Sequence, residues 1–167
     1  MADLIVALSA TNTDYLGDLP TSAPGMTGED VPLYWAWRAH PAIPSTHAFF
    51  NVRVGPQAAV LRGLAPLEAR ILAATSAPRI DLLLLQVSTW WILEFHGHAG
   101  LAQLGRVVCY PELLRETYDA DVEVRSAVVS WTLNPFLEGS FTRRRIPVFV
   151  YTTDRPEPRL VNPAALI

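Results

Sequence analysis

Lysine is absent from this 167-residue chain, and cysteine occurs only once, at Cys109. All 13 basic residues are therefore arginines, and no chemistry of this chain can use a lysine amine. A single cysteine excludes an intramolecular disulfide and fits a reducing compartment. The net charge of −3 excludes a chain that is basic as a whole. Any contact with nucleic acid must then be local or assisted by a metal ion.

Long uninterrupted apolar runs are also missing. Asp81, Gln86 and Glu94 interrupt the most hydrophobic stretch, so the sequence predicts no membrane span. Residues 4–7 are apolar, but Asp3 precedes them and no basic residue does, which is unlike a secretory signal. We expect a cytoplasmic or virion-associated protein that is neither secreted nor bound to a membrane.

Half of the residues are apolar and five are tryptophans, which predicts one globular domain with a substantial core. Prolines concentrate at both ends of the chain. They predict an extended or turn-rich arm over residues 1–48 and a tail over residues 155–167, on either side of a folded domain over 49–154.

An aromatic patch lies within the proline-rich arm, at Tyr34, Trp35 and Trp37. One interpretation is that the arm packs on its own domain. The other is that it binds a partner, because exposed aromatic side chains mark interfaces.

Helical and β-rich segments alternate through the rest of the chain. A helix is expected after Pro66, and another over 99–109 that Pro111 should kink or restart, with Leu101, Leu104 and Val108 on one face. A short helix or loop is expected over 133–145, and strands over 48–54, 80–85, 122–131 and 146–153. This order predicts an α/β fold with a mixed central sheet flanked by helices.

Two acids stand out in the strand segments. Asp81 heads a run that is apolar on both faces, where an unpaired carboxylate is costly. If residues 87–88 form a hairpin tip, Asp81 lies opposite Glu94, with Cβ atoms roughly 5 Å apart. Two carboxylates that close repel each other unless a cation lies between them or one is protonated. Period-2 alternation places His96 on the same face as Glu94.

These residues resemble the motif of the PD-(D/E)XK nuclease superfamily, with Asp81, then Glu94, and His96 where the family has lysine. Gln103 and Tyr110 in the following helix resemble the Q…Y signature of its RecB-like branch. The resemblance covers roughly residues 64–153 and implies a restriction-endonuclease-like fold, here with a proline-rich arm and a tail.

The resemblance also implies roles for these residues. Asp81 and Glu94 would hold Mg²⁺ or Mn²⁺, assisted by Glu68 from the preceding helix. His96 would act as the base that orients or deprotonates water, with Gln103 in support. The phosphates of DNA would be bound by Arg143, Arg144, Arg145 and Tyr110, although the arginine triplet also fits a solvated turn before a strand.

Two functions follow from this interpretation. The first is metal-dependent hydrolysis of DNA phosphodiesters. The second is a nuclease-fold protein without catalysis that serves as a structural component, as in a phage virion or head-tail connector. Its arm and tail would then contact neighbouring subunits.

A zinc site is a weaker alternative. Glu94, His96 and His98 spell E-x-H-x-H, and three protein ligands plus water form a catalytic zinc site. Gly97 is expected to bend the strand and turn His98 away. Cys109 is expected to fill the core rather than act as a nucleophile.

Overall fold

The computed structural model describes residues 2–10, 12–16, 19–26, 28–55 and 78–166. Its main feature is a mixed sheet, seven-stranded over this part of the chain, in the order β1-β2-β3-β4-β6-β8-β9. The strands are β1 (Tyr15–Leu16), β2 (His47–Arg53), β3 (Arg79–Gln86), β4 (Thr89–Phe95), β6 (Glu123–Ser130), β8 (Val148–Thr152) and β9 (Arg155–Val161). Neighbours from β1 to β4 are antiparallel, β6 is parallel to both β4 and β8, and β9 is antiparallel to β8. Beside this sheet, β5 (His98–Ala99) and β7 (Thr132–Leu133) pair in parallel.

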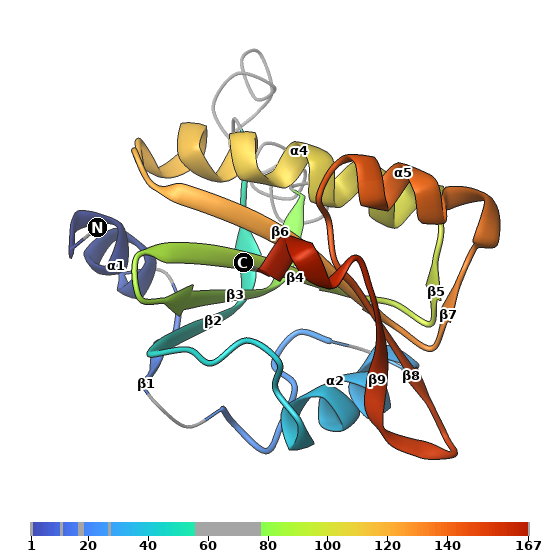
Figure 1. The fold of residues 1–167 in the computed structure, drawn as a ribbon. Helices are drawn as coiled ribbons and strands as arrows, with labels where there is room; N and C mark the ends of the chain where they lie inside the picture. The colour runs from blue at the N-terminus through green and yellow to red at the C-terminus, as the bar shows by residue number, and fades with distance from the viewer. Residues whose placement is uncertain (1, 11, 17–18, 27, 56–77, 167) are drawn as a thin grey trace, which may run out of the picture.

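Helices cover both faces of the sheet (Figure 1). The helix α4 (Leu101–Tyr118) and the short α5 (Glu138–Arg143) lie over one face, and α2 (Asp30–Ala39) lies against the other. The remaining helical elements are α1 (Ala2–Ser9), η1 (Pro135–Leu137) and η2 (Pro163–Leu166). The predicted α/β class, with a mixed sheet flanked by helices, is confirmed. None of the described helices is both long and apolar enough to cross a membrane.

The apolar run of β3 is covered on both sides, as its sequence predicts. Leu82 and Leu84 belong to the core under α2, together with Trp91 and Leu93 of β4. Leu83 belongs to the opposite core, which α1 and α4 cover. A strand buried on both faces reads as continuous hydrophobic sequence rather than as an alternation.

The β-rich segments 48–54, 122–131 and 146–153 form β2, β6 and β8, which confirms those predictions. Helix α4 extends beyond the predicted segment 99–109 to Tyr118, so Pro111 does not restart it. Its inward face also differs, since Leu101 and Val108 are exposed.

The face of α4 that packs on the sheet is a different one from the face that the sequence predicted. The side chains that α4 buries are Gln103, Leu104, Val107, Tyr110 and Leu114, at helical spacing. Cys109 lies outside this stripe and is exposed, so the expectation that it fills the core is wrong.

The prediction of an extended arm is wrong for residues 2–9 and 30–39, which are helical. Tyr34 and Trp37 of α2 are fully buried against the sheet, and the Tyr34 hydroxyl donates a hydrogen bond to the Pro20 carbonyl at 2.8 Å. Those two aromatics thus pack on their own domain and offer no surface to a partner. Trp35 remains 55% exposed.

The prediction of a tail from residue 155 is also wrong. Residues 155–161 form β9, which pairs with β8 at the edge of the sheet. Proline is tolerated in an edge strand because its missing N–H can face away from the neighbouring strand. The folded domain therefore includes helices and a strand from the two proline-rich segments that the sequence predicted to lie outside it.

Candidate functional site

The β3–β4 hairpin brings the two predicted carboxylates together. Its register pairs Gln86 with Thr89 and Leu82 with Leu93, which confirms the tip at residues 87–88. Asp81 and Glu94 are the next positions beyond the last of these pairs.

Both carboxylates there accept hydrogen bonds from main-chain groups of the opposite strand. The Asp81 N–H donates to Oε1 of Glu94 at 3.2 Å, and the Phe95 N–H donates to Oδ2 of Asp81 at 2.9 Å. The two side chains therefore replace ladder hydrogen bonds at the end of the hairpin.

Burial and mutual repulsion perturb the titration of this pair. Glu94 is only 1% exposed, and its burial, followed by the charge of Asp81, raises its pKa to about 8. Burial likewise raises the pKa of Asp81 to about 6. Two carboxyls in such contact titrate as a unit. Near neutral pH the pair holds one proton between its two members.

Arg106 of α4 is the cation of the site. Its Nη1 donates to Oε2 of Glu94 at 3.3 Å, and its side chain is half exposed. Arg106 lies three residues after Gln103 and four before Tyr110, so all three project toward the same part of the sheet. That spacing could have identified Arg106 from the sequence, where it had no predicted role.

Asp30 joins the site from the opposite layer. It is the first residue of α2, and its Oδ1 lies 3.7 Å from Nδ1 of His96, longer than a hydrogen bond. Burial raises the pKa of Asp30, and the nearby charge of His96 opposes that shift. The charge of Asp30 in turn raises the pKa of Asp81. No local pattern in the sequence marks Asp30, because tertiary folding alone brings it here.

His96 follows the last residue of β4, and its backbone N–H donates to the Val129 carbonyl at 3.0 Å. Its imidazole is half exposed and faces Asp30 through Nδ1. The predicted base therefore lies at the rim of the site, while Glu94 lies beneath it.

Gln103 and Tyr110 both have structural contacts. The Gln103 side chain accepts a hydrogen bond from the Gly100 N–H at 3.1 Å, which caps the first turn of α4. Tyr110 packs in the core under α4, and burial raises the pKa of its hydroxyl to about 12. Both side chains are nearly buried, so neither presents a broad surface to a phosphate.

The arginine triplet lies apart from the carboxylate pair. Arg143 ends α5 and donates to the Ser140 hydroxyl, while Arg144 and Arg145 line a cavity beside the outer side of α4. Arg106, and not a member of the triplet, is the arginine whose charge acts on both carboxylates. The structure therefore does not bring the triplet together with the predicted metal ligands.

Two other predicted ligands fall outside this geometry. Glu68 lies outside the described residues. His98 lies in β5, where its Nδ1 is 2.8 Å from the Thr132 hydroxyl, so the E-x-H-x-H motif does not converge on one face. Within the described part of the chain, no three Asp, Glu, His or Cys side chains form a group that could hold a metal ion.

The carboxylate pair nevertheless has donor chemistry that suits magnesium, which takes one or two carboxylates and retains several waters. The repulsion between Asp81 and Glu94 is the observation that favours a cation, because a positive charge between them would relieve it. No protein-family model, no curated protein and no solved structure matches this chain.

Proposed function

We propose that this chain is a divalent-metal-dependent phosphodiesterase that acts on DNA and has a restriction-endonuclease-like fold of the PD-(D/E)XK type. The observation that carries the proposal is the meeting of Asp81 and Glu94 at the end of an antiparallel hairpin. The crossover through α4 to the parallel strand β6, which brings Arg106 over Glu94, supports it.

The roles of the residues follow from their contacts. Asp81 and Glu94 would hold Mg²⁺ or Mn²⁺, which when bound polarises the scissile phosphate and acidifies a bound water. Glu94 must first release its proton, and the guanidinium of Arg106 favours that release by stabilising the carboxylate.

His96 is the base in this scheme. Because its Nδ1 faces Asp30, Nε2 is the nitrogen left to accept the proton of the attacking water. Imidazole is the side-chain group that most often serves as a general base in proteins. Asp30 would orient the ring and stabilise the imidazolium that forms.

The test is hydrolysis of labelled duplex and single-stranded DNA, in Mg²⁺ or Mn²⁺ and again in EDTA. We expect metal-dependent cleavage by the wild type and none by Asp81→Asn or Glu94→Gln. Glu112→Gln is the matched control, since Glu112 is an exposed glutamate of α4. Cleavage that persists in both site variants, or an inactive wild type, would contradict the proposal.

A second function is favoured by a different observation. Glu94 is almost fully buried, and each of its two oxygens already accepts a hydrogen bond, from Asp81 and from Arg106. A carboxylate engaged in this way can be a structural remnant in a protein that serves only in assembly with neighbouring subunits. Under that function the wild type neither binds the metal nor cleaves DNA. Trp35, which is still exposed, is then the residue of the aromatic patch that can contact a partner.

A further inference from the structure

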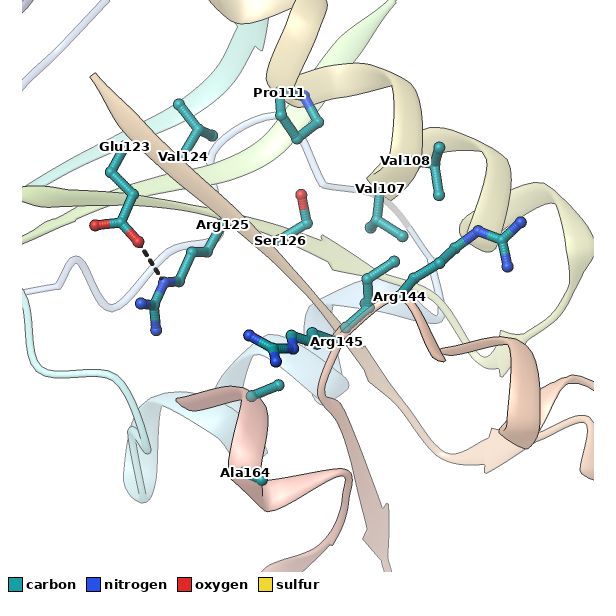
Figure 2. A pocket seen from close by; sticks show the side chains of 12 residues that line it. Val107, Val108, Pro111, Glu123, Val124, Arg125, Ser126, Arg144, Arg145 and Ala164 are labelled. Carbon is teal, nitrogen blue, oxygen red and sulfur yellow. Dashed lines mark hydrogen bonds and ion pairs between the residues drawn. The ribbon is translucent and has the colours of Figure 1, made fainter. Parts of the chain in front are cut away.

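A cavity of about 560 Å³ opens beside α4, on the side of Val108 and Pro111 rather than that of Arg106. Figure 2 shows its walls, which come from α4, the first half of β6, the α5–β8 connection and η2. The volume is in the range of ligand pockets. No residue of the carboxylate site lines this cavity.

The floor of the cavity is an unpaired strand edge. Pairing of β6 with β8 begins at Val128, whose N–H donates to the Pro147 carbonyl at 3.1 Å. Successive residues of a strand direct their main-chain groups to alternate sides. The N–H and C=O groups of Val124 and Ser126 therefore point toward the same edge as those of Val128. The Val129 carbonyl, which accepts from His96, points to the other side, as this alternation requires.

Two sequence features keep this edge open. Pro147 has no N–H, so it cannot donate to the Ser126 carbonyl and extend the parallel ladder toward the start of β6. Arg145 has a φ of +55°, a left-handed conformation that turns the preceding chain away. Among the described residues, no strand pairs with this side of β6 between Glu123 and Ala127.

One of the cations that line the cavity has no partner among the described residues. Of the three arginines that line it, Arg125 pairs with Glu123 at 2.8 Å and Arg144 donates to the Ser140 carbonyl. The guanidinium of Arg145 has no hydrogen bond or ion pair to any described residue.

A buried hydroxyl lines the same cavity. Ser126 is 7% exposed, and its Oγ has no hydrogen-bond partner within the described part of the chain. Unsatisfied buried polar atoms are rare in folded proteins and call for an explanation.

We propose that the cavity binds an extended peptide segment of a partner protein, which adds as a strand to the open edge of β6 and places an acidic side chain against Arg145. Strand addition satisfies the main-chain groups of Val124 and Ser126 and gives affinity through backbone hydrogen bonds. The free guanidinium selects a carboxylate, because the ion pair formed there is a charge-assisted hydrogen bond. Val107 and Val108 of α4 supply an apolar wall against which another side chain of the peptide can pack.

Nucleic acid fits the cavity less well than a peptide. Binding to a duplex neutralises several phosphates at once. Here a single guanidinium is unpaired, and the Glu123 carboxylate lies at the rim. A small anion would engage Arg145 but would leave the strand edge unpaired.

The probe for the test is a five-residue peptide, blocked at both ends, with a central glutamate flanked on each side by valine and then threonine. Amide signals of the ¹⁵N-labelled full chain are followed by NMR while the probe is added up to 2 mM. We expect saturable shifts and slowed hydrogen exchange at the Val124 and Ser126 amides. The Arg125 and Ala127 amides, which face β4, should change less and act as an internal control.

Two comparisons separate strand addition from simple charge attraction. Arg145→Gln should weaken binding by roughly tenfold or more through loss of the charge-assisted hydrogen bond. Arg143→Gln, from the same triplet but outside the cavity lining, should leave binding unchanged. A probe with N-methylated backbone amides should not bind.

Three results would overturn the proposal. The first is the absence of any shift up to 2 mM. The second is equal binding of the N-methylated probe, which would leave only charge attraction. The third is binding of a short DNA duplex or inorganic phosphate at the same amides in place of the peptide. Because these readouts need neither metal nor hydrolysis, the proposed phosphodiesterase and this peptide site can fail independently.

Discussion

Replacing Glu94 by glutamine should stabilise the metal-free protein at alkaline pH. In the wild type, burial and the charge of Asp81 raise the pKa of Glu94 from 4.5 to about 8. A carboxyl whose pKa is raised by folding binds more protons in the folded state, so stability is lost as pH rises. That loss begins above the unfolded pKa of about 4.5 and is complete above about 8.

The magnitude follows from the difference between the two pKa values. Each pKa unit corresponds to about 1.4 kcal/mol, so ionisation of Glu94 costs on the order of 5 kcal/mol of folding free energy by pH 8. Glutamine removes this cost while keeping an oxygen that can accept from the Asp81 N–H. Its NH₂ group can donate to the Asp81 carboxylate, and the half-exposed Arg106 can turn to water.

The assay is urea unfolding in EDTA at pH 5, 6.5 and 8, with the free energy of unfolding taken from linear extrapolation. The free energy of unfolding of the wild type should fall by several kcal/mol from pH 5 to pH 8. Glu94→Gln should vary much less and should be the more stable protein at pH 8. Glu112→Gln should follow the wild type throughout. The reasoning is refuted if wild-type stability holds or rises toward pH 8 and Glu94→Gln is the less stable protein there.

Three further predictions follow from the same structure, each measured by urea unfolding. Val87 has a φ of +53° at the first loop position of the β3–β4 hairpin, where glycine is favoured, so Val87→Gly should stabilise by about 0.5–1 kcal/mol and Val87→Ala should not. Trp37→Ala should destabilise by about 3–5 kcal/mol because Trp37 is fully buried, whereas Trp35→Ala should cost less than about 1 kcal/mol; equal costs would show that the α2 packing is wrong. Arg106→Gln should destabilise by about 1–3 kcal/mol at pH 9, where Glu94 is largely ionised, and much less at pH 5; a loss independent of pH would contradict their pairing.

The apolar pattern of the sequence marked the two strands of the hairpin, whereas its tip was an assumption that the structure confirms. Because side chains alternate along a strand, a tip at residues 87–88 leaves one register, and that register places Asp81 beside Glu94. The strands β2, β6 and β8 could also be predicted from the sequence, since β-branched and aromatic runs bounded by turn residues mark them.

Proline composition was the main source of error. Pro32 lies in the first turn of α2, where its missing N–H has no helical partner to lose, so it does not oppose the helix. Pro156 and Pro158 lie in the edge strand β9, where they are also tolerated. Proline density alone therefore does not predict irregular chain, because the first turn of a helix and an edge strand both tolerate proline.

The rest of the site required tertiary information. Asp30 reaches His96 from a helix on the opposite face of the sheet, and the two are far apart in sequence. The helical spacing of Arg106 from Gln103 and Tyr110 was a signal in the sequence, but only the packing of α4 shows that this arginine lies over Glu94. The arginine triplet was conspicuous in the sequence, yet the end of α5 places Arg144 and Arg145 at a cavity that no residue of the carboxylate site lines.

The most direct test of the central claim is calorimetric titration of Mg²⁺ and Mn²⁺ into the wild type and Asp81→Asn at pH 8, where Glu94 can ionise. If Asp81 and Glu94 form a metal site, the wild type binds the ion with a measurable heat and the variant does not. Since binding of the cation displaces the shared proton, the heat should also depend on the ionisation enthalpy of the buffer. Absence of binding in the wild type, or equal binding in both proteins, would contradict the claim that this carboxylate pair holds a divalent metal.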